Sequence, residues 1–265
     1  MKVFVGHTNV KSLLSPTKLG ADFVINPYIG CPHGCIYCYA ASGTCKKWNE
    51  NRKWGTFVNV KIPTEKIRGA KLCGKSILLS SMTDAYNPYE ARSLVTRHIL
   101  EALVPTEPQI VIITKSALVV RDIDIFTKFP HVHITFSFSS LEDDFRRKAE
   151  PYAASPDAKI KAMARLHDAG IDTSVMAAPI FPMITDGAAI ARATAPYTSH
   201  IMFDTLNVRS GNRDRILSFA TDLRPDLKDL YEAIYLHKDR SFWHQERERL
   251  KKACDFYGME CKTLF

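Results

Sequence analysis

The chain has 265 residues, of which 46% are hydrophobic, and its 36 Lys and Arg against 28 Asp and Glu give a formal net charge of +8. This is enough apolar material for a large core, and one main domain is expected. No run of 18 apolar residues occurs and the opening residues do not resemble a secretory leader, so we expect a cytoplasmic protein without a membrane span. Seven cysteines, an odd number, do not indicate a disulfide framework.

The first predicted strand, residues 23 to 27, leads into the segment NPYIGCPHGCIYCYA at residues 26 to 40. Its cysteines, Cys31, Cys35 and Cys38, are spaced to bind three of the four irons of a cubane iron-sulfur cluster. The fourth iron would then be open to a substrate or cofactor. A zinc knuckle completed by His33 or Cys45 is the alternative, although such sites usually contain a second pair of closely spaced cysteines, which this sequence lacks.

After the cysteine segment, short apolar runs alternate with polar or amphipathic stretches. This alternation is typical of βαβ units on a parallel sheet. Periodicity alone fits a partial barrel and a doubly wound open sheet equally well, and both bind ligands beyond the carboxyl ends of their strands. The further predicted strands are residues 76 to 82, 109 to 115, 132 to 138, 171 to 178 and 200 to 206, and the predicted helices are residues 90 to 103, 121 to 126, 155 to 169 and 188 to 195.

One predicted helix has readable ends. Ser155, Pro156 and Asp157 provide a cap, a first-turn proline and an early acid, and Gly170 closes the helix. The charged stretch from residue 225 to 257 is predicted to be helical and to cap the core, followed by a short tail. We therefore divide the chain into a core at residues 1–215 and a helical extension at residues 216–265.

Polar residues follow several of the predicted strands, where this kind of fold binds ligands. Asp84 follows the second strand and could accept hydrogen bonds from an ammonium group, or could equally cap a turn. Lys115 closes the third strand, and a lysine there needs a partner such as a carboxylate unless its side chain reaches solvent. Ser137 and Ser139 lie at the end of the fourth.

The CxxxCxxC spacing with Tyr37 before the last cysteine resembles the radical S-adenosylmethionine (radical SAM) superfamily. The NPY before the motif and the YCYA around its end are similar to the spore photoproduct lyase-like branch. The resemblance implies a partial (β/α)6 TIM-type barrel with parallel strands and a C-terminal helical cap. It also implies a 4Fe-4S cluster, S-adenosylmethionine, and an electron donor such as flavodoxin or ferredoxin. In this superfamily an electron from the cluster cleaves S-adenosylmethionine to a 5'-deoxyadenosyl radical, which abstracts hydrogen from the substrate.

The same resemblance implies roles for the polar residues at the strand ends. It places Tyr37 by the adenine and assigns the methionyl carboxylate to Lys115 and Ser137, with Ser139 nearby. The strand end containing Ser81, Thr83 and Asp84 is expected to help bind the amino group. Pro179, together with Pro182, is expected to shape the cofactor wall through the backbone. Tyr39 or Tyr86 could relay a hydrogen atom or stack on a base, although most tyrosines are packing residues.

One residue departs from the branch. Spore photoproduct lyase has a hydrogen-donating cysteine near the end of the second strand, whereas Ser81 occupies the corresponding place here. A hydroxyl holds its hydrogen too strongly to replace a thiol, so we expect a different reaction. The basic excess favours a nucleic-acid base as substrate, by repair or modification. A peptide or small molecule is the alternative within this enzyme class, and a zinc-stabilised nucleic-acid-binding protein is the alternative outside it.

Several remaining residues have no assigned role in this interpretation. Cys45, Cys73, Cys254 and Cys261 lack the spacing of a second cluster loop. His131 and His133 alternate at a strand start and match no catalytic motif.

Overall fold

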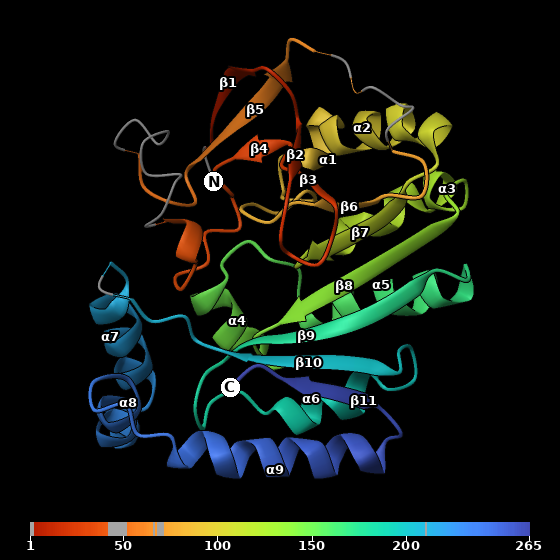
Figure 1. The fold of residues 1–265 in the computed structure, drawn as a ribbon. Helices are drawn as coiled ribbons and strands as arrows, with labels where there is room; N and C mark the ends of the chain where they lie inside the picture. The colour runs from red at the N-terminus through yellow and green to blue at the C-terminus, as the bar shows by residue number, and fades with distance from the viewer. Residues whose placement is uncertain (1–2, 42–51, 66, 68–71, 210) are drawn as a thin grey trace.

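The computed structural model describes residues 3–41, 52–65, 67, 72–209 and 211–265. Cys45, one of the zinc ligands considered above, lies outside these described residues. The main element of the fold is an eight-stranded sheet in the order β11-β10-β9-β8-β7-β6-β3-β2 (Figure 1). The strands from β3 to β11 are parallel, and β2 is antiparallel to β3. The bounds are β2 Leu14–Pro16, β3 Phe23–Ile25, β6 Ser76–Leu79, β7 Gln109–Thr114, β8 His131–Phe138, β9 Asp172–Ile180, β10 His200–Thr205 and β11 Glu260–Thr263.

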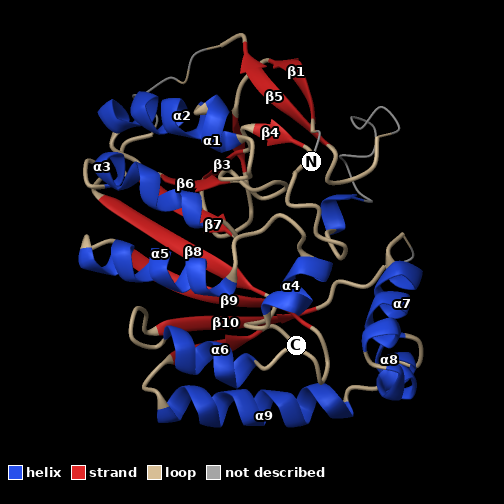
Figure 2. Ribbon diagram, turned by 180° about the vertical axis from the view of Figure 1, so that it is seen from behind, coloured by secondary structure: helices blue, strands red, loops and turns tan. Residues whose placement is uncertain are grey.

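The sheet is an α/β arrangement of the partial TIM-barrel kind, with β2 and β11 as its two edges rather than a closed ring. Figure 2 shows α2, α3, α5 and α6 covering one of its faces. The side chains that strands and helices bury between them form the main core, which includes Ile112, Phe136 and Val175. The helices are α1 Glu90–Ser93, α2 Val95–Leu103, α3 Ile123–Phe126, α4 Asp143–Ala149, α5 Pro156–Asp168, α6 Gly187–Thr194, α7 Arg213–Leu223, α8 Lys228–Tyr235 and α9 Ser241–Phe256.

All six predicted strands are present, with ends shifted by three residues or fewer. The capped helix is present as α5, where the Ser155 hydroxyl accepts a hydrogen bond from the Ala158 amide at 3.2 Å and Gly170 follows with φ +71°. This agreement follows from local chemistry, because the cap and the left-handed closing residue act on their own neighbours.

The helical segment predicted over residues 90 to 103 is present as two helices, α1 and α2, because the chain breaks at Leu94, whose φ is +55°. The break allows the buried Glu90 carboxylate to accept the Thr96 amide at 2.9 Å in the first turn of α2, where a negative charge is favourable. Arg121 donates to the same carboxylate at 2.8 Å. The helix predicted at residues 121 to 126 begins as a 3-10 helix, Ala117–Asp122, before α3. Helix α4 was not predicted.

A second, smaller sheet was also not predicted. It pairs β1 (Phe4–Val10) in parallel with β5 (Phe57–Pro63), and β4 (Tyr28–Ile29) lies antiparallel on the other side of β5. Because β4 ends two residues before Cys31, this sheet holds the start of the cysteine loop in place.

The C-terminal part is more than a helical cap. Its tail forms β11, which pairs in parallel with β10 and so extends the main sheet. The boundary suggested at residue 215 falls within α7. Helices α6 and α9 pack closely, since a Cβ on Gly187 would lie 2.7 Å from the Leu250 side chain. None of the described helices is long and apolar enough to cross a membrane.

Candidate active site

The three cysteines of the motif lie in one tight loop after β4. The Gly34 amide donates to the Cys31 carbonyl at 3.2 Å, and the Cys38 amide donates to the Cys35 carbonyl at 3.2 Å. Gly34 lies against Gly55, where a Cβ would be 2.9 Å from the Gly34 Cα. The close approach therefore requires that Gly55 lack a side chain, and the φ of +67° at Gly34 favours glycine there as well.

The Cys31 and Cys35 thiols are buried, Cys38 is half-buried, and the three are close enough to influence one another electrostatically. Burial raises the pKa of both Cys31 and Cys35, and the neighbouring thiols add to the effect. The backbone amides of Asp84 and His33 donate to Cys31 and partly oppose it. A bound metal deprotonates such thiols outright. The loop is therefore suited to holding a metal centre.

The spacing of the sulfur atoms bears on which metal centre the loop could hold. A tetrahedral zinc ion with Zn–S bonds of about 2.3 Å holds its sulfurs about 3.8 Å apart. In the described part of the chain, one group of three His, Cys, Asp or Glu side chains has ligand atoms that all lie within 4.8 Å of one another. None of the three is a cysteine. The Nδ1 atom of His33, the other zinc ligand considered, lies 3.4 Å from an Asp84 oxygen. Because Cys45 lies outside the described residues, the zinc knuckle predicted as the alternative is not tested by this geometry.

A group of charged side chains lies beside the loop, at the carboxyl ends of β7 and β8. The Lys115 ammonium lies 2.6 Å from the Ser137 hydroxyl and 3.2 Å from a Glu150 carboxylate oxygen. Lys159 donates to the Ser137 carbonyl at 2.8 Å. The structure thus places Lys115 and Ser137 together, and the lysine has a carboxylate partner rather than reaching solvent.

Glu150 is the negative centre of this group and is completely buried. Burial alone would raise its pKa, but the ammonium groups of Lys115 and Lys159 lower it to about 2. Burial lowers the pKa of Lys159 to about 8 despite the attraction of Glu150. The Glu150 carboxylate also accepts the Tyr37 hydroxyl, which links the group to the cysteine motif. No role for the Glu150 side chain was predicted from the sequence, because its partners come from distant segments.

Asp84 has its carboxylate engaged within the fold. It accepts hydrogen bonds from the Tyr86 amide at 2.8 Å, the Lys115 amide at 2.8 Å and the Thr114 hydroxyl at 2.9 Å. This is the turn role considered from the sequence, now extended to the end of β7. An ammonium group of a bound ligand would therefore have to share the Asp84 carboxylate with these hydrogen bonds, which already link the ends of β6 and β7.

The strand end after β6 is held in an unusual conformation. Ser80 has φ +69°, and Asn26 of the NPY segment accepts the Ser81 and Met82 amides at 2.9 and 3.1 Å. Such backbone strain is characteristic of functional sites. Asn26 was not singled out from the sequence, although it begins the NPY segment.

The Ser139 hydroxyl hydrogen-bonds to the Glu150 carboxylate. Two other buried hydroxyl oxygens near these strand ends, Ser80 Oγ and Thr83 Oγ1, have no hydrogen-bond partner among the described residues. A buried polar atom left unpaired costs about 1 to 3 kcal/mol. Their concentration at the carboxyl ends of the strands indicates a place prepared for a polar ligand.

The tyrosines occupy three different environments. Tyr37 packs against Phe181 at 5.8 Å between ring centres. Tyr39 is 45% exposed and donates to the Ser81 carbonyl, which keeps it beside the site. Tyr86 is completely buried, and its hydroxyl donates to Asp122 at 2.9 Å. The ring and hydroxyl of Tyr86 are therefore part of the core, and its suggested relay or stacking role stays a prediction.

The backbone just before Pro179 contacts the charged group. The preceding Ala178 carbonyl accepts hydrogen bonds from Ser137 at 3.1 Å and from Lys115 at 3.3 Å. The Ala178–Pro179 peptide bond is cis. Strand β9 thus joins the charged group through a main-chain oxygen.

Known proteins share both the sequence and the fold of this chain. The family model described as Radical SAM superfamily matches residues 25–192. An uncharacterized protein of Methanocaldococcus jannaschii is 34% identical over 236 residues, which is 88% of this chain and 87% of that protein. An uncharacterized protein of Mycobacterium tuberculosis is 24% identical, covering 80% of this chain and 67% of its own length.

Among solved structures, the fold matches spore photoproduct lyase, in one case a mutant with bound AdoMet and dinucleoside spore photoproduct. That match has a TM-score of 0.65 and 14% sequence identity, and covers 98% of this chain and 81% of the lyase. The family model spans more than half of the chain and includes all three cysteines and the strand ends described above. The chain belongs to the radical SAM superfamily of enzymes, which use a 4Fe-4S cluster and S-adenosylmethionine.

Proposed function

We propose that this enzyme cleaves S-adenosylmethionine reductively at a cluster held by Cys31, Cys35 and Cys38, and directs the 5'-deoxyadenosyl radical to a nucleic-acid base. The observation that carries the proposal is one juxtaposition. The cysteine loop lies beside the Lys115–Ser137 pair and the unpartnered polar atoms at the strand ends. When bound, the cluster supplies the electron and S-adenosylmethionine supplies the radical.

The residues at the strand ends fit S-adenosylmethionine. Lys115 and the Ser137 hydroxyl offer a charge-assisted site for its carboxylate. The unpaired hydroxyl of Thr83 can pair with its polar groups, and the Ser139 hydroxyl lies nearby on Glu150. Glu150 keeps Lys115 charged and oriented, because their ion pair is buried away from water. We assign Tyr37 to the adenine side and Ser81 to the side of the amino group.

A nucleic-acid substrate is supported by a basic patch beside the cysteine loop, formed by Arg209, Arg213 and Arg215. All three are exposed; Arg213 and Arg215 lie in the first turn of α7, and Arg209 lies in the loop that leads into it. This start is anchored to the loop, because Ile216 packs in the same apolar cluster as Ile36 and Tyr37. Phosphate groups bound there would bring a base towards the loop.

The reaction itself differs from that of spore photoproduct lyase in this proposal. Ser81 lies where that enzyme has its hydrogen-donating cysteine, and its hydroxyl is engaged by the Asn26 side chain at 3.4 Å. A hydroxyl is a poor hydrogen-atom donor, so the product radical needs another fate. We further infer a cytoplasmic setting with a small electron donor such as flavodoxin or ferredoxin.

The first experiment tests the chemistry. The chain is reconstituted anaerobically with iron and sulfide, reduced in the presence of S-adenosylmethionine, and assayed for methionine and 5'-deoxyadenosine. Formation of both by the wild type but not by Cys35→Ala supports the proposal, and Cys254→Ala serves as the matched cysteine control. A colourless protein with one tightly bound zinc would contradict it.

The second experiment tests the substrate. Deuterium carried by the bases of DNA or RNA should appear in 5'-deoxyadenosine, whereas label confined to peptide or small-molecule substrates would reject the nucleic-acid proposal. Each lost phosphate contact lowers the slope of log affinity against log salt by about 0.9. For the double variant Arg213→Ala/Arg215→Ala, this slope should therefore be smaller by up to about twice that amount. Lys251→Ala/Lys252→Ala, which removes two exposed charges from α9, should leave the slope unchanged.

A further inference from the structure

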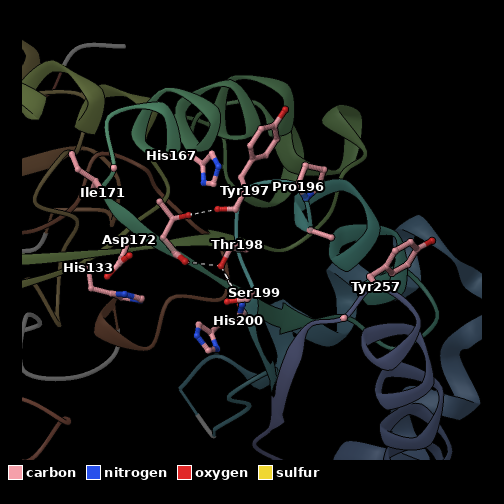
Figure 3. A pocket seen from close by; sticks show the side chains of 14 residues that line it. His133, His167, Ile171, Asp172, Pro196, Tyr197, Thr198, Ser199, His200 and Tyr257 are labelled. Atoms are coloured by element: carbon pink, nitrogen blue, oxygen red, sulfur yellow. Dashed lines mark hydrogen bonds between the residues drawn. The ribbon is translucent and has the colours of Figure 1, made fainter.

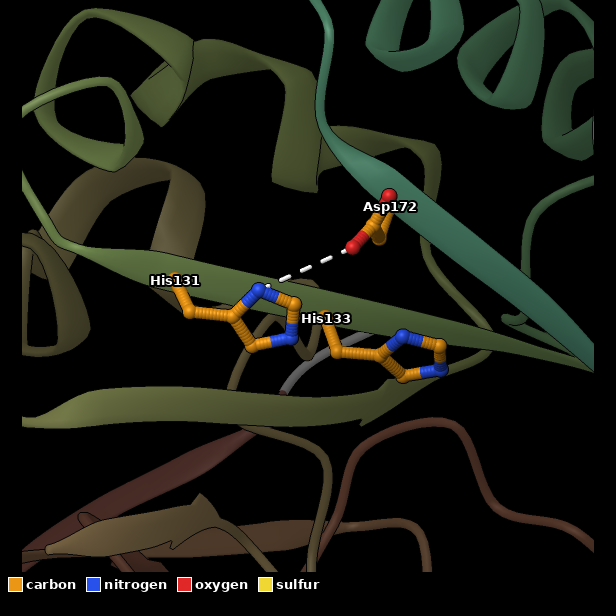
Figure 4. A group of neighbouring side chains, drawn as sticks. All are labelled: His131, His133 and Asp172. Carbon is orange, nitrogen blue, oxygen red and sulfur yellow. Dashed lines mark ion pairs between the residues drawn. The ribbon is translucent and has the colours of Figure 1, made fainter.

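A second group of ligand-type side chains lies at the opposite, amino end of the strands. His131 and His133 belong to β8 and Asp172 to β9, and one ligand atom from each lies within 4.8 Å of the other two. Figure 4 shows the two imidazoles side by side on one strand, with the carboxylate reaching towards them from the next. None of these residues takes part in the cysteine site.

The strand geometry explains why the three side chains meet. Residues two apart on a strand point to the same face, so His131 and His133 both project from one side of β8. Asp172 is directly opposite His133 in the parallel register of β8 and β9. The Asp172 carboxylate already lies 3.6 Å from His131 Nδ1. Two adjacent imidazoles and a facing carboxylate form a preorganised three-ligand set.

The His133 ring is oriented by a second layer of hydrogen bonds. Its Nε2 atom lies 2.8 Å from the Ser174 hydroxyl, which is in turn 2.8 Å from the Thr135 hydroxyl. This leaves Nδ1 as the nitrogen of His133 that is available to coordinate a metal ion. Metal-binding histidines usually have their other ring nitrogen fixed in this way.

The site is open to solvent and has room for further ligands. His133 and Asp172 line a hollow of about 590 Å³, which also contains His200 (Figure 3). His131 and Asp172 have side chains that are 47% and 65% exposed. A bound ion could therefore complete its coordination with water.

We propose that His131, His133 and Asp172 bind a divalent transition-metal ion of the zinc class. Mixed imidazole and carboxylate ligands select such ions over Mg²⁺ or Ca²⁺. The site is separate from the cluster: Ser137 lies four residues further along β8, which is about 13 Å of strand. Because the ligands belong to two neighbouring strands at the end of the sheet opposite the cysteine loop, the ion would clip β8 to β9 and stabilise the fold rather than react with substrate.

The test uses the full chain without a histidine tag and with its cluster reconstituted. Equilibrium dialysis against zinc, with iron and zinc counted by elemental mass spectrometry, should find one zinc per chain and unchanged iron. His133→Ala and Asp172→Asn should each weaken zinc binding by more than tenfold, and Ser174→Ala by about tenfold. His244→Ala, which removes an exposed histidine of α9, should leave zinc binding unchanged.

Two further measurements separate this site from alternatives. Cys35→Ala should retain the zinc, since its cysteine belongs to the other site. Zinc should raise the melting temperature of the wild type but not that of His133→Ala. The proposal is overturned if the wild type with an intact cluster takes up no zinc, or if His133→Ala binds zinc as tightly as the wild type.

Discussion

Replacing Glu150 with glutamine should destabilise the fold strongly. Glu150 is completely buried, lies 3.2 Å from the Lys115 ammonium and has a pKa of about 2 against an ordinary value of 4.5. At about 1.4 kcal/mol for each tenfold change, this difference corresponds to about 3 kcal/mol of stability from the ionised carboxylate. Glutamine keeps the shape but leaves Lys115 and Lys159 without their counter-charge, a change that typically costs about 3 to 5 kcal/mol.

The destabilisation caused by Glu150→Gln should change with pH in a definite direction. A carboxylate whose pKa is lowered in the folded state contributes its full stability above pH 4.5, and loses it as the pH falls towards 2. The difference in unfolding free energy between wild type and Glu150→Gln should therefore be largest at pH 7, and should fall to roughly half by pH 3.

Urea denaturation followed by far-UV circular dichroism at these two pH values measures the difference. Glu142→Gln is the matched control, because Glu142 is exposed in the same region and its replacement should change stability by less than about 0.5 kcal/mol. A loss below about 1 kcal/mol for Glu150→Gln, or a loss independent of pH, would refute the reasoning about the buried charge group.

Three other predictions follow from single contacts. Ser137→Ala should weaken S-adenosylmethionine binding by about tenfold through loss of one charge-assisted hydrogen bond, while iron content stays constant; unchanged affinity in calorimetry would remove Ser137 from the site. Tyr86→Phe should lower the free energy of unfolding by about 1 to 2 kcal/mol and keep S-adenosylmethionine cleavage. Loss of cleavage in this variant would indicate a catalytic role for Tyr86. Gly55→Ala should reduce iron retention, because its Cβ would lie 2.9 Å from Gly34 Cα, whereas Gly74→Ala at a similar positive φ meets no atom within 4 Å and should not; equal iron content in both variants would contradict the close approach.

The strand and helix pattern was largely readable from the chain, for reasons seen in particular elements. Strand β7 is an unbroken apolar run, and α5 is bounded by Ser155 and Gly170, so local composition is sufficient. The small sheet and β11 were missed because their short strands are stabilised by partners distant in sequence. The break at Leu94 was missed for a similar reason, since it serves the buried carboxylate of Glu90.

The sequence alone predicted where the cluster binds, and its resemblance to the radical SAM superfamily indicated which cofactor the enzyme uses. The spacing of Cys31, Cys35 and Cys38 in one short loop is a local property, and a local pattern suffices to recognise it. Tertiary structure decided what surrounds that loop: it buried Glu150 between two lysines and placed Tyr86 in the core. It also brought two histidines of one strand against an aspartate of the next. These outcomes depend on strand register and burial, which act between residues far apart in the chain and leave no signal in the order of the residues themselves.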